Sequence, residues 1–429
     1  MRYTQELIDF LNASPVNFLA VEEMKKQLAG AGFRHVSLAD EWQGLKAGDM
    51  VMTSKNDSSV YAVRIGRKPM AEVGFKLICA HCDSPTFRIK PQAEMTGEGN
   101  VIRLNVEVYG GPIMSTWFDR PLSLAGRVMM RGESPLAPVT RLLHIKKPLI
   151  VIPNLAIHFN RQVNDGVKLS KQKDMLPLME VSALIEEGLG RDEMLLHVIA
   201  RELKVKVEDI IDFDLYLYDT TPACTVGLGD ELVSAGRLDD LSMVHAGLTA
   251  LMEAEVSDQT QVLAIFDNEE TGSMTKQGAQ SPVLRNILLR IAGDELALVR
   301  AVENSFMVSA DNAHAFHPNY AEKYDPTNHP VMGGGPVVKI NAAQKYATDA
   351  RSSAIFKEIC RKAGVPCQTF VNHSDVAGGS TLGNILTSSL PLSGVDMGNP
   401  IWAMHSVRET ASALDHKYCI QAFRAFYNL

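Results

Sequence analysis

The sequence predicts an α/β fold in which a mixed, mostly parallel sheet lies between helices, with a second, mostly β domain inserted into the first. Two observations predict this architecture. Short apolar runs at 76–80, 261–266 and 305–310 lack polar alternation, which is typical of central strands covered on both faces. Apolar residues at helical spacing lie between these runs, so strands and helices alternate along the chain.

The first element that we expect is a helix over 17–33. Val21, Met24 and Leu28 recur there at three- and four-residue spacing, and glycines follow as a stop signal. A second helix is expected over 241–253, because its apolar residues form one stripe. Both helices carry an apolar face that can cover the predicted sheet.

A different pattern lies between the first apolar run and the second. Residues 98–111 and 212–220 alternate in period two, as strands with one exposed face do. Two helices are expected in the same region, over 175–189 and 191–205. We therefore predict that 91–229 form an inserted, mostly β domain.

The flanking segments 1–90 and 230–429 then form one discontinuous domain, in which we expect the chemistry. At roughly 100 to 200 residues per domain, a chain of 429 residues fits two or three domains. Its 46% hydrophobic and 21% charged residues are typical of globular proteins and exclude disordered, fibrous and disulfide-scaffold classes.

Charge and cysteine usage narrow the functional class further. A net charge of -8 without clusters of Lys and Arg argues against nucleic-acid binding. Six cysteines without paired zinc-finger spacing fit a reducing compartment, and Cys79 and Cys82 are more typical of buried thiols than of a redox motif. No run of about 18 apolar residues occurs, so we expect a cytoplasmic protein without membrane contact.

Residues of metal-binding types stand directly after each of the three apolar runs. In open α/β sheets such residues gather at the carboxyl ends of the strands. In chain order they are His81 with Asp83, the acidic segment 267–270, and Asp311. Further residues of ligand type are Asp239 and Asp240, which are adjacent, and His405.

Each of these residues also has an ordinary explanation. A histidine at a strand end is usually a hydrogen-bonded surface residue, adjacent acids usually form a solvated turn, and Asp239 fits a helix N-cap. Three buried strands that deliver such groups to one edge would, however, cost desolvation and mutual repulsion, which a divalent cation relieves. The sequence therefore predicts a metal site.

The types of these residues indicate the metal. Histidine with carboxylates, and no well-spaced cysteines, suits Zn²⁺, with Mn²⁺ or Co²⁺ as possible substitutes. A single catalytic zinc takes three protein ligands, so two ions that share a bridging carboxylate fit the set better. Two ions about 3.5 to 4 Å apart polarise a carbonyl and activate a water for attack. The five candidate ligands are His81, Asp239, Glu270, Asp311 and His405.

A general base is needed to take the proton of that water. Glu269 precedes the candidate ligand Glu270, and neighbouring side chains of an extended backbone point apart, so one can bind metal while the other faces the substrate. Asp83 stands two residues after His81, near enough to orient its imidazole. We therefore expect Glu269 and Asp83 to be the catalytic carboxylates.

Six segments in this order resemble the aspartyl aminopeptidase family of dinuclear-zinc exopeptidases. They are AHCDSP (80–85), GRLDDL (236–241), FDNEETGS (266–273), SADNAHAFHPNY (309–320), and SDVAGGSTLG (374–383) with MHS (404–406). The resemblance covers essentially the whole chain, including the insertion. It implies a bridging Asp239, with His81 and Asp311 on one zinc, Glu270 and His405 on the other, and Glu269 as the base.

The resemblance also implies substrate contacts from His158, His314, Lys339 and Tyr346. His158 would reach the active site of a neighbouring subunit, in a tetrahedral dodecamer assembled through the inserted domain. For Lys339 the sequence alone leaves a solvated strand lysine as an equal alternative, while the functional interpretation is a cation that holds an acidic substrate group.

The expected function is removal of the N-terminal residue of peptides, with a preference for Asp or Glu that rests on the resemblance. Two zinc ions would activate the water, and Glu269 would carry its proton to the leaving amine. Two alternatives remain: a dinuclear-metal deacylase or amidase of related fold, and a catalytically silent scaffold protein.

Overall fold

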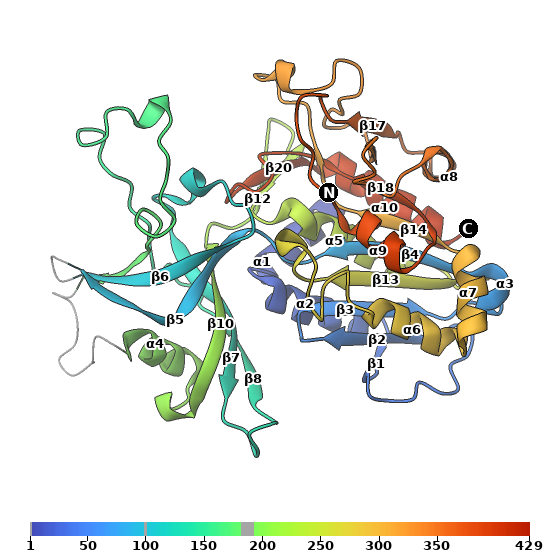
Figure 1. Cartoon of the computed structure of the whole chain (residues 1–429), viewed down its shortest axis with the longest axis horizontal. Coiled ribbons are helices and arrows are strands. Elements are labelled where there is room, and N and C mark those ends of the chain that lie inside the picture. Colours follow the sequence, from blue (N-terminus) through green and yellow to red (C-terminus); the bar gives the residue numbers. More distant parts are fainter. Residues whose placement is uncertain (1, 98–100, 182–192) are drawn as a thin grey trace. The chain divides into compact units, whose positions relative to one another are not determined.

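The chain divides into two compact units. The computed structural model describes residues 2–97, 101–181 and 193–429 (Figure 1). The first unit comprises Met1–Asp83, Ala223–Met404 and Glu409–Leu429. The second unit comprises Ser84–Pro222 and His405–Arg408. Its long segment lies close to the insertion expected at 91–229.

A nine-stranded sheet forms the centre of the first unit. The strands, in spatial order, are β1 (Arg34–His35), β2 (Met50–Lys55), β3 (Ser59–Arg64), β13 (Thr260–Phe266), β4 (Phe75–His81), β14 (Phe306–Ala310), β18 (Ser393–Gly398), β16 (Val337–Ile340) and β17 (Gln368–Val371). The pairs β13–β4, β4–β14 and β14–β18 at the centre are parallel, whereas β2–β3, β3–β13 and β18–β16 are antiparallel. The predicted mixed, mostly parallel sheet is confirmed.

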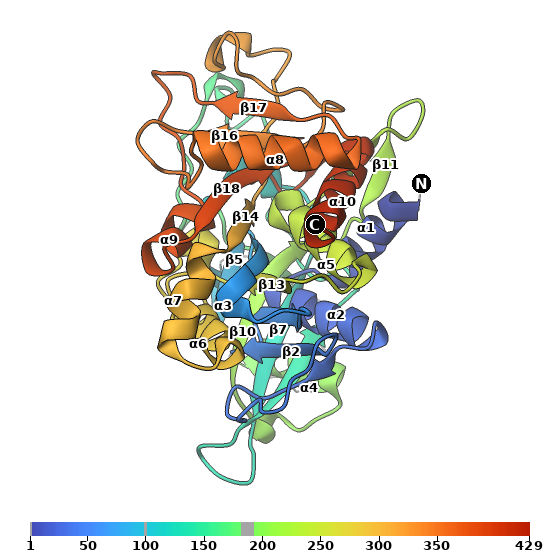
Figure 2. The same ribbon diagram turned by 90° about the vertical axis from the view of Figure 1, so that its right-hand side faces the viewer.

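The central strands are covered on both faces, as the apolar runs predicted. Every residue of β4 and β13 is buried. Helices α1 (Arg2–Ala13), α2 (Asn17–Gly30), α5 (Leu238–Glu253), α8 (Ala350–Ala363) and α10 (Ala413–Tyr427) contribute to the core on one face. Helices α6 (Val283–Ala292), α7 (Glu295–Glu303) and α9 (Leu382–Ser389) contribute to the core on the other face (Figure 2).

The helices expected over 17–33 and 241–253 are present as α2 and α5. Three of the others begin at capped N-termini. Asp294 caps α7, Asp349 and Ser352 form a capping box at α8, and the hydroxyl of Ser412 accepts hydrogen bonds at the start of α10. These caps satisfy backbone N–H groups that a helix leaves without partners.

The smaller elements of the first unit flank the main sheet. The short helix α3 (Met70–Val73) precedes β4. A five-stranded sheet has the order β11 (Cys224–Val226), β12 (Leu232–Ala235), β20 (Glu409–Ser412), β19 (Pro400–Trp402) and β15 (Ala313–His314). Two 3-10 helices in this unit are η6 (Glu269–Thr271) and η7 (Ala321–Lys323).

The second unit is a six-stranded antiparallel sheet with one described α-helix. Its strands, in spatial order, are β8 (Val139–His144), β7 (Leu122–Met130), β10 (Ile210–Asp219), β5 (Thr86–Gly97), β6 (Val101–Tyr109) and β9 (Leu178–Val181). The helix α4 (Met194–Leu203) lies between β9 and β10 in the chain. Short 3-10 helices are η1 (Met114–Trp117), η2 (Val163–Asp165) and η5 (Val207–Asp209). The strands expected at 98–111 and 212–220 are present as β6 and β10, although 98–100 lie outside the described residues.

One expected element of this unit is wrong. The helix predicted over 175–189 is contradicted at Leu178–Val181, which form β9 and pair with β6. Met175 and Met179 are buried in the core of the sheet, so pairing with an existing strand determines the backbone here instead of local helical spacing. Positions 182–189 lie outside the described residues. The helix expected over 191–205 corresponds to α4.

No helix among the residues that the structure describes is both long and apolar enough to cross a membrane.

Candidate metal centre

The ends of three parallel strands bring the candidate ligands to one edge of the main sheet. β4 ends at His81, between β13 and β14. Asp311 directly follows β14, and the residues after β13 turn into η6, which begins at Glu269. Because parallel neighbours finish at the same edge, groups far apart in sequence meet there (Figure 1).

Two overlapping groups of ligand atoms share His81. In each group, all ligand atoms lie within 4.8 Å of one another. One group is His81, Asp239 and Glu270, and the other is His81, Asp240 and Asp311. His81 Nε2 lies 3.6 Å from Asp239 Oδ1. The structure thus brings together four of the five predicted ligands, and adds Asp240.

The fifth predicted ligand, His405, belongs to the second unit. Its ring Nδ1 lies 3.1 Å from the carbonyl oxygen of Gly111, and its own carbonyl accepts a hydrogen bond of 2.9 Å from the amide of Ile113. Its left-handed φ of 70° belongs to the turn that holds this segment. A role for His405 as a metal ligand therefore stays a prediction.

Asp83 organises the residues around His81. Its carboxylate oxygens accept hydrogen bonds from the backbone amides of Glu269 and Glu270, each 3.1 Å long. Its Oδ1 lies 3.3 Å from His81 Nδ1, and its backbone oxygen lies 3.0 Å from the same nitrogen. One buried carboxylate therefore positions both the imidazole and the loop that carries the two glutamates.

Several carboxyl groups are buried close together around His81. Burial raises the pKa of Glu269 to about 8, and the carboxylate of Asp311 adds to this rise while His81 opposes it. Burial also raises the pKa of Asp311 and raises that of Asp240 well above the ordinary value. A divalent cation is the partner that such a set of buried acids and imidazole fits, so the residues present suit zinc.

Lys339 is buried next to this cluster. Its Nζ lies 3.4 Å from Asp311 Oδ2 and 5.6 Å from the centre of the Tyr346 ring. Only 3% of Lys339 is exposed, so the alternative of a solvated strand lysine is wrong. Burial lowers the pKa of Lys339, but the negative groups around it, Asp311 foremost, together outweigh burial, and the net direction is a rise. The ammonium therefore stays charged.

The other two predicted substrate contacts lie at exposed positions. His314 is in β15, three residues after Asp311, and its ring meets that of Phe370 edge-on at 5.9 Å between centroids. His158 is exposed in a loop of the second unit. Both roles stay predictions.

Two further acids near the ligand groups lie outside the five predicted ligands. Asp240 Oδ2 accepts a hydrogen bond of 3.2 Å from the amide of His81, and Oδ1 lies 3.3 Å from Asn312 Nδ2. Glu409 is buried, and its Oε2 accepts a 3.0 Å hydrogen bond from the amide of Asp239. The pair Asp239–Asp240 was a visible signal, whereas nothing in the sequence around Glu409 marks it as buried.

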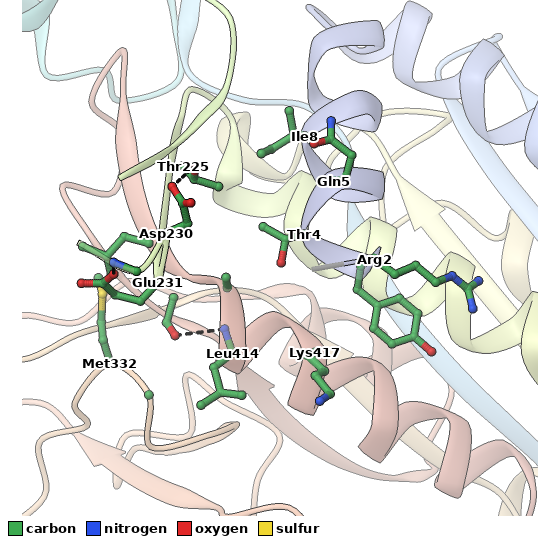
Figure 3. A pocket seen from close by; sticks show the side chains of 16 residues that line it. Arg2, Thr4, Gln5, Ile8, Thr225, Asp230, Glu231, Met332, Leu414 and Lys417 are labelled. Atoms are coloured by element: carbon green, nitrogen blue, oxygen red, sulfur yellow. Dashed lines mark hydrogen bonds between the residues drawn. The ribbon is translucent and has the colours of Figure 1, made fainter. Parts of the chain in front are cut away.

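Figure 3 shows a pocket elsewhere in the first unit, with a volume of about 900 Å³. It lies between α1, the β11–β12 hairpin and the start of α10, with Ile8, Glu231 and Lys417 among its lining residues. Its described lining includes none of the predicted site residues. The candidate chemistry is therefore at the strand ends and not in this pocket.

Imidazole and carboxylate groups gathered at the carboxyl edge of a parallel sheet place the chain among the metal-dependent hydrolases. The family model described as "Aminopeptidase I zinc metalloprotease (M18)" matches residues 10–427. The chain therefore belongs to the M18 family of zinc aminopeptidases.

Relatives of known name and solved structures agree with this assignment. The "Probable M18 family aminopeptidase 2" of Clostridium acetobutylicum is 50% identical over 433 residues, which cover 100% of this chain and 99% of the relative. The protein of the same name from Pseudomonas aeruginosa is 43% identical and covers 99% of this chain and 97% of its own length.

Two solved structures have the same fold. Ape4, solved by cryo-EM in complex with Nbr1, is 35% identical with a TM-score of 0.95, and the match covers 99% of this chain and 85% of that one. The S. cerevisiae mApe1 dodecamer is 26% identical with a TM-score of 0.86, and the match covers 99% of this chain and 96% of that one.

Proposed function

We propose that the chain is a dinuclear zinc aminopeptidase that removes the N-terminal residue of peptides and prefers Asp or Glu there. The observation that carries the proposal is the pair of ligand groups that share His81, since one imidazole with four carboxylates exceeds what a single zinc needs. Mn²⁺ or Co²⁺ would fit the same donors. His405 would complete the set.

When bound, the zinc ions would polarise the scissile carbonyl and make a water easier to deprotonate. Glu269 would take the proton from that water at its carboxylate and give it to the leaving amine. Asp83 would keep Glu269 in place, because its carboxylate accepts a hydrogen bond from the backbone amide of Glu269. The buried position of Glu269 beside the ligand groups suits a side chain that takes a proton and returns it.

The acidic preference would rest on Lys339. Its charged ammonium is buried beside the ligand cluster, where a carboxylate of the substrate would find a partner in a site of low dielectric. Tyr346 packs over the ammonium and restricts its position. His314 is proposed as a further contact to the substrate.

The test is an assay of the zinc-loaded protein on aminoacyl anilides of Asp, Glu, Ala and Leu, with N-acetyl-Asp beside them. The proposal expects cleavage of the Asp and Glu substrates in preference to the others. Cleavage of only the N-acylated substrate would identify the deacylase alternative. Retention of no divalent metal, with no activity after metal addition, would identify the scaffold alternative.

We also propose a homo-oligomer, a dodecamer, in which the second unit forms contacts and His158 reaches a neighbouring subunit. The dodecameric state of the relative mApe1 supports this. So does the exposed apolar surface around His158, where 82% of Phe159 is exposed. Light scattering coupled to size-exclusion chromatography measures the mass directly. A cytoplasmic location stays a prediction.

A further inference from the structure

A second buried carboxylate lies next to Lys339 on the main sheet. Asp396 is fully buried in β18, the strand between β14 and β16 (Figure 2). β16 and β18 are antiparallel and Val338 faces Met397, so the next position along sets Lys339 opposite Asp396. Side chains that face each other across two strands point to the same side of a sheet. Burial lowers the pKa of Lys339, and Asp396 stands with Asp311 among the groups that raise it.

The carboxylate of Asp396 accepts hydrogen bonds from two other segments. Its Oδ2 accepts a 2.6 Å hydrogen bond from the backbone amide of Ala347, and its Oδ1 accepts one of 2.6 Å from the hydroxyl of Thr381. The backbone amide of Asp396 donates a 2.8 Å hydrogen bond to the hydroxyl of Thr348. Short hydrogen bonds to a carboxylate are among the stronger polar contacts in a protein. Asp396 therefore connects β18 to the loop before α8 and to the start of α9.

The hydrogen bond from Ala347 determines where Tyr346 lies. The amide of Ala347 belongs to the planar peptide unit that begins at Tyr346, so holding this amide also holds the backbone that carries the tyrosine ring. Tyr346 is buried, and its ring centre lies 5.6 Å from Lys339 Nζ. Lys339 on the sheet and Tyr346 on the loop thus have Asp396 as a common neighbour.

The second donor, Thr381, comes from the glycine-rich segment SDVAGGSTLG (374–383), to which the proposed chemistry gives no role. Thr381 is the N-cap of α9, but its side chain makes no capping hydrogen bond and donates to Asp396 instead. A Cβ on Gly383 would collide with the Asp396 carboxylate, so the close approach of α9 requires glycine there. The segment is therefore built to reach Asp396.

We propose that Asp396 is a positioning residue for the subsite that binds the side chain of the substrate's N-terminal residue, and that it sets the preference for an acidic side chain there. This inference rests on the proposed function, because the subsite is that of Lys339 and Tyr346. Asp396 does not touch the substrate. It holds the loop of Tyr346 and the start of α9 against β18, so that a substrate carboxylate meets a cation that is already in place.

The test measures kcat and KM of the zinc-loaded wild type and variants on aminoacyl anilides of Asp, Glu and Ala. Asp396→Ala removes both accepting oxygens. We expect kcat/KM for the Asp and Glu substrates to fall about 10- to 100-fold, mainly through KM, and that for the Ala substrate to change by less than about threefold. Asp396→Asn keeps one accepting oxygen and should recover most of the loss. A merely structural defect would lower the rates on all three substrates alike.

A second pair of variants tests the same contact from the side of α9. Thr381→Val removes only the hydroxyl that donates to Asp396, and it should lower the ratio of kcat/KM for Asp over Ala about three- to tenfold. Thr381→Ser keeps the hydroxyl and should keep the ratio. The matched control is Asp349→Asn, which changes an acid of the same loop that caps α8 instead, and it should have the wild-type ratio.

The inference is overturned if the wild type prefers acidic substrates and both Asp396→Ala and Thr381→Val retain that preference. If Asp396→Ala does not fold, an unchanged ratio in Thr381→Val overturns it alone. Equal loss of preference in Asp396→Asn and Asp396→Ala would also overturn it, because charge and not hydrogen bonding would then be responsible. A wild type without any acidic preference would contradict the proposed function, and this inference with it.

Discussion

At the scale of single residues, adjacent acids in this protein have different partners. The backbone amides of Glu269 and Glu270 both donate to Asp83, while only the Glu270 side chain joins a ligand group. The side chain of Asp239 is a member of one ligand group and that of Asp240 of the other. Sequence neighbours therefore have different surroundings, because their side chains leave the backbone in different directions.

We predict that Glu269→Gln lowers kcat by about 10²- to 10⁴-fold, because the amide cannot take a proton. The bound zinc should be unchanged, since Glu269 belongs to neither ligand group. The matched variant Glu270→Gln should lose metal as well as activity. Elemental analysis and initial rates measure the two quantities, and normal turnover of Glu269→Gln would remove it from its role as base.

At the scale of elements, close contact between strand ends fixes the position of Asp311. A Cβ on Gly398, the last residue of β18, would lie 1.8 Å from the carbonyl oxygen of Asp311. This distance is far inside van der Waals contact, so β14 and β18 can approach as they do only with glycine at that position.

We predict that Gly398→Ala destabilises the protein by about 1–3 kcal/mol, the range typical of overpacking, and lowers activity because Asp311 moves. Urea denaturation and initial rates are the measurements. Gly379→Ala is the control, because a Cβ there meets no atom within 4 Å. Equal stability of the two variants would contradict the packing argument.

The loop before β16 is held by the side chain of Asp415. Asp415 in α10 accepts 2.7 Å hydrogen bonds from the amides of Gly333 and Gly335, yet burial raises its pKa to about 6. The folded protein therefore binds this proton more tightly than the unfolded chain, and the contribution of Asp415 to stability falls as pH rises from about 4 to about 6.

We predict that the free energy of unfolding of Asp415→Asn falls less between pH 4 and pH 6.5 than that of the wild type, by about 2 kcal/mol. The comparison is between the unfolding free energies of wild type and variant at pH 4 and at pH 6.5, measured in urea. Asn also loses one acceptor, which lowers stability by a similar amount at both pH values. A difference between the proteins that does not change with pH would contradict the assignment.

How far the sequence predicted these elements depended on what determined each one. The three apolar runs were read correctly as β4, β13 and β14, because burial on both faces leaves no polar alternation. The strand β9 was missed because its partner β6 lies far away in sequence. In the site, strand ends located His81 and Asp311, whereas the burial of Glu409 and Lys339 depends on tertiary packing that no local pattern records.

At the scale of the whole molecule, metal should contribute to stability as well as to chemistry. The acids around His81 repel one another and are buried, so removal of the cations leaves that repulsion uncompensated. A chelator should lower the melting temperature, and added zinc should restore it. A ligand at 1,000 times its Kd stabilises by about 4 kcal/mol, which calorimetry resolves easily. An unchanged transition after verified metal removal would contradict this.

The order of strands in the main sheet has a consequence for the growing polypeptide on the ribosome. β4 is finished at His81, but its two neighbours, β13 and β14, are translated only with Thr260–Phe266 and Phe306–Ala310. The sheet of the second unit needs only strands encoded between Thr86 and Asp219. The inserted sheet can therefore form first during synthesis. Until β13 and β14 are made, β4 stays unpaired and exposes an apolar segment of the kind that chaperones bind.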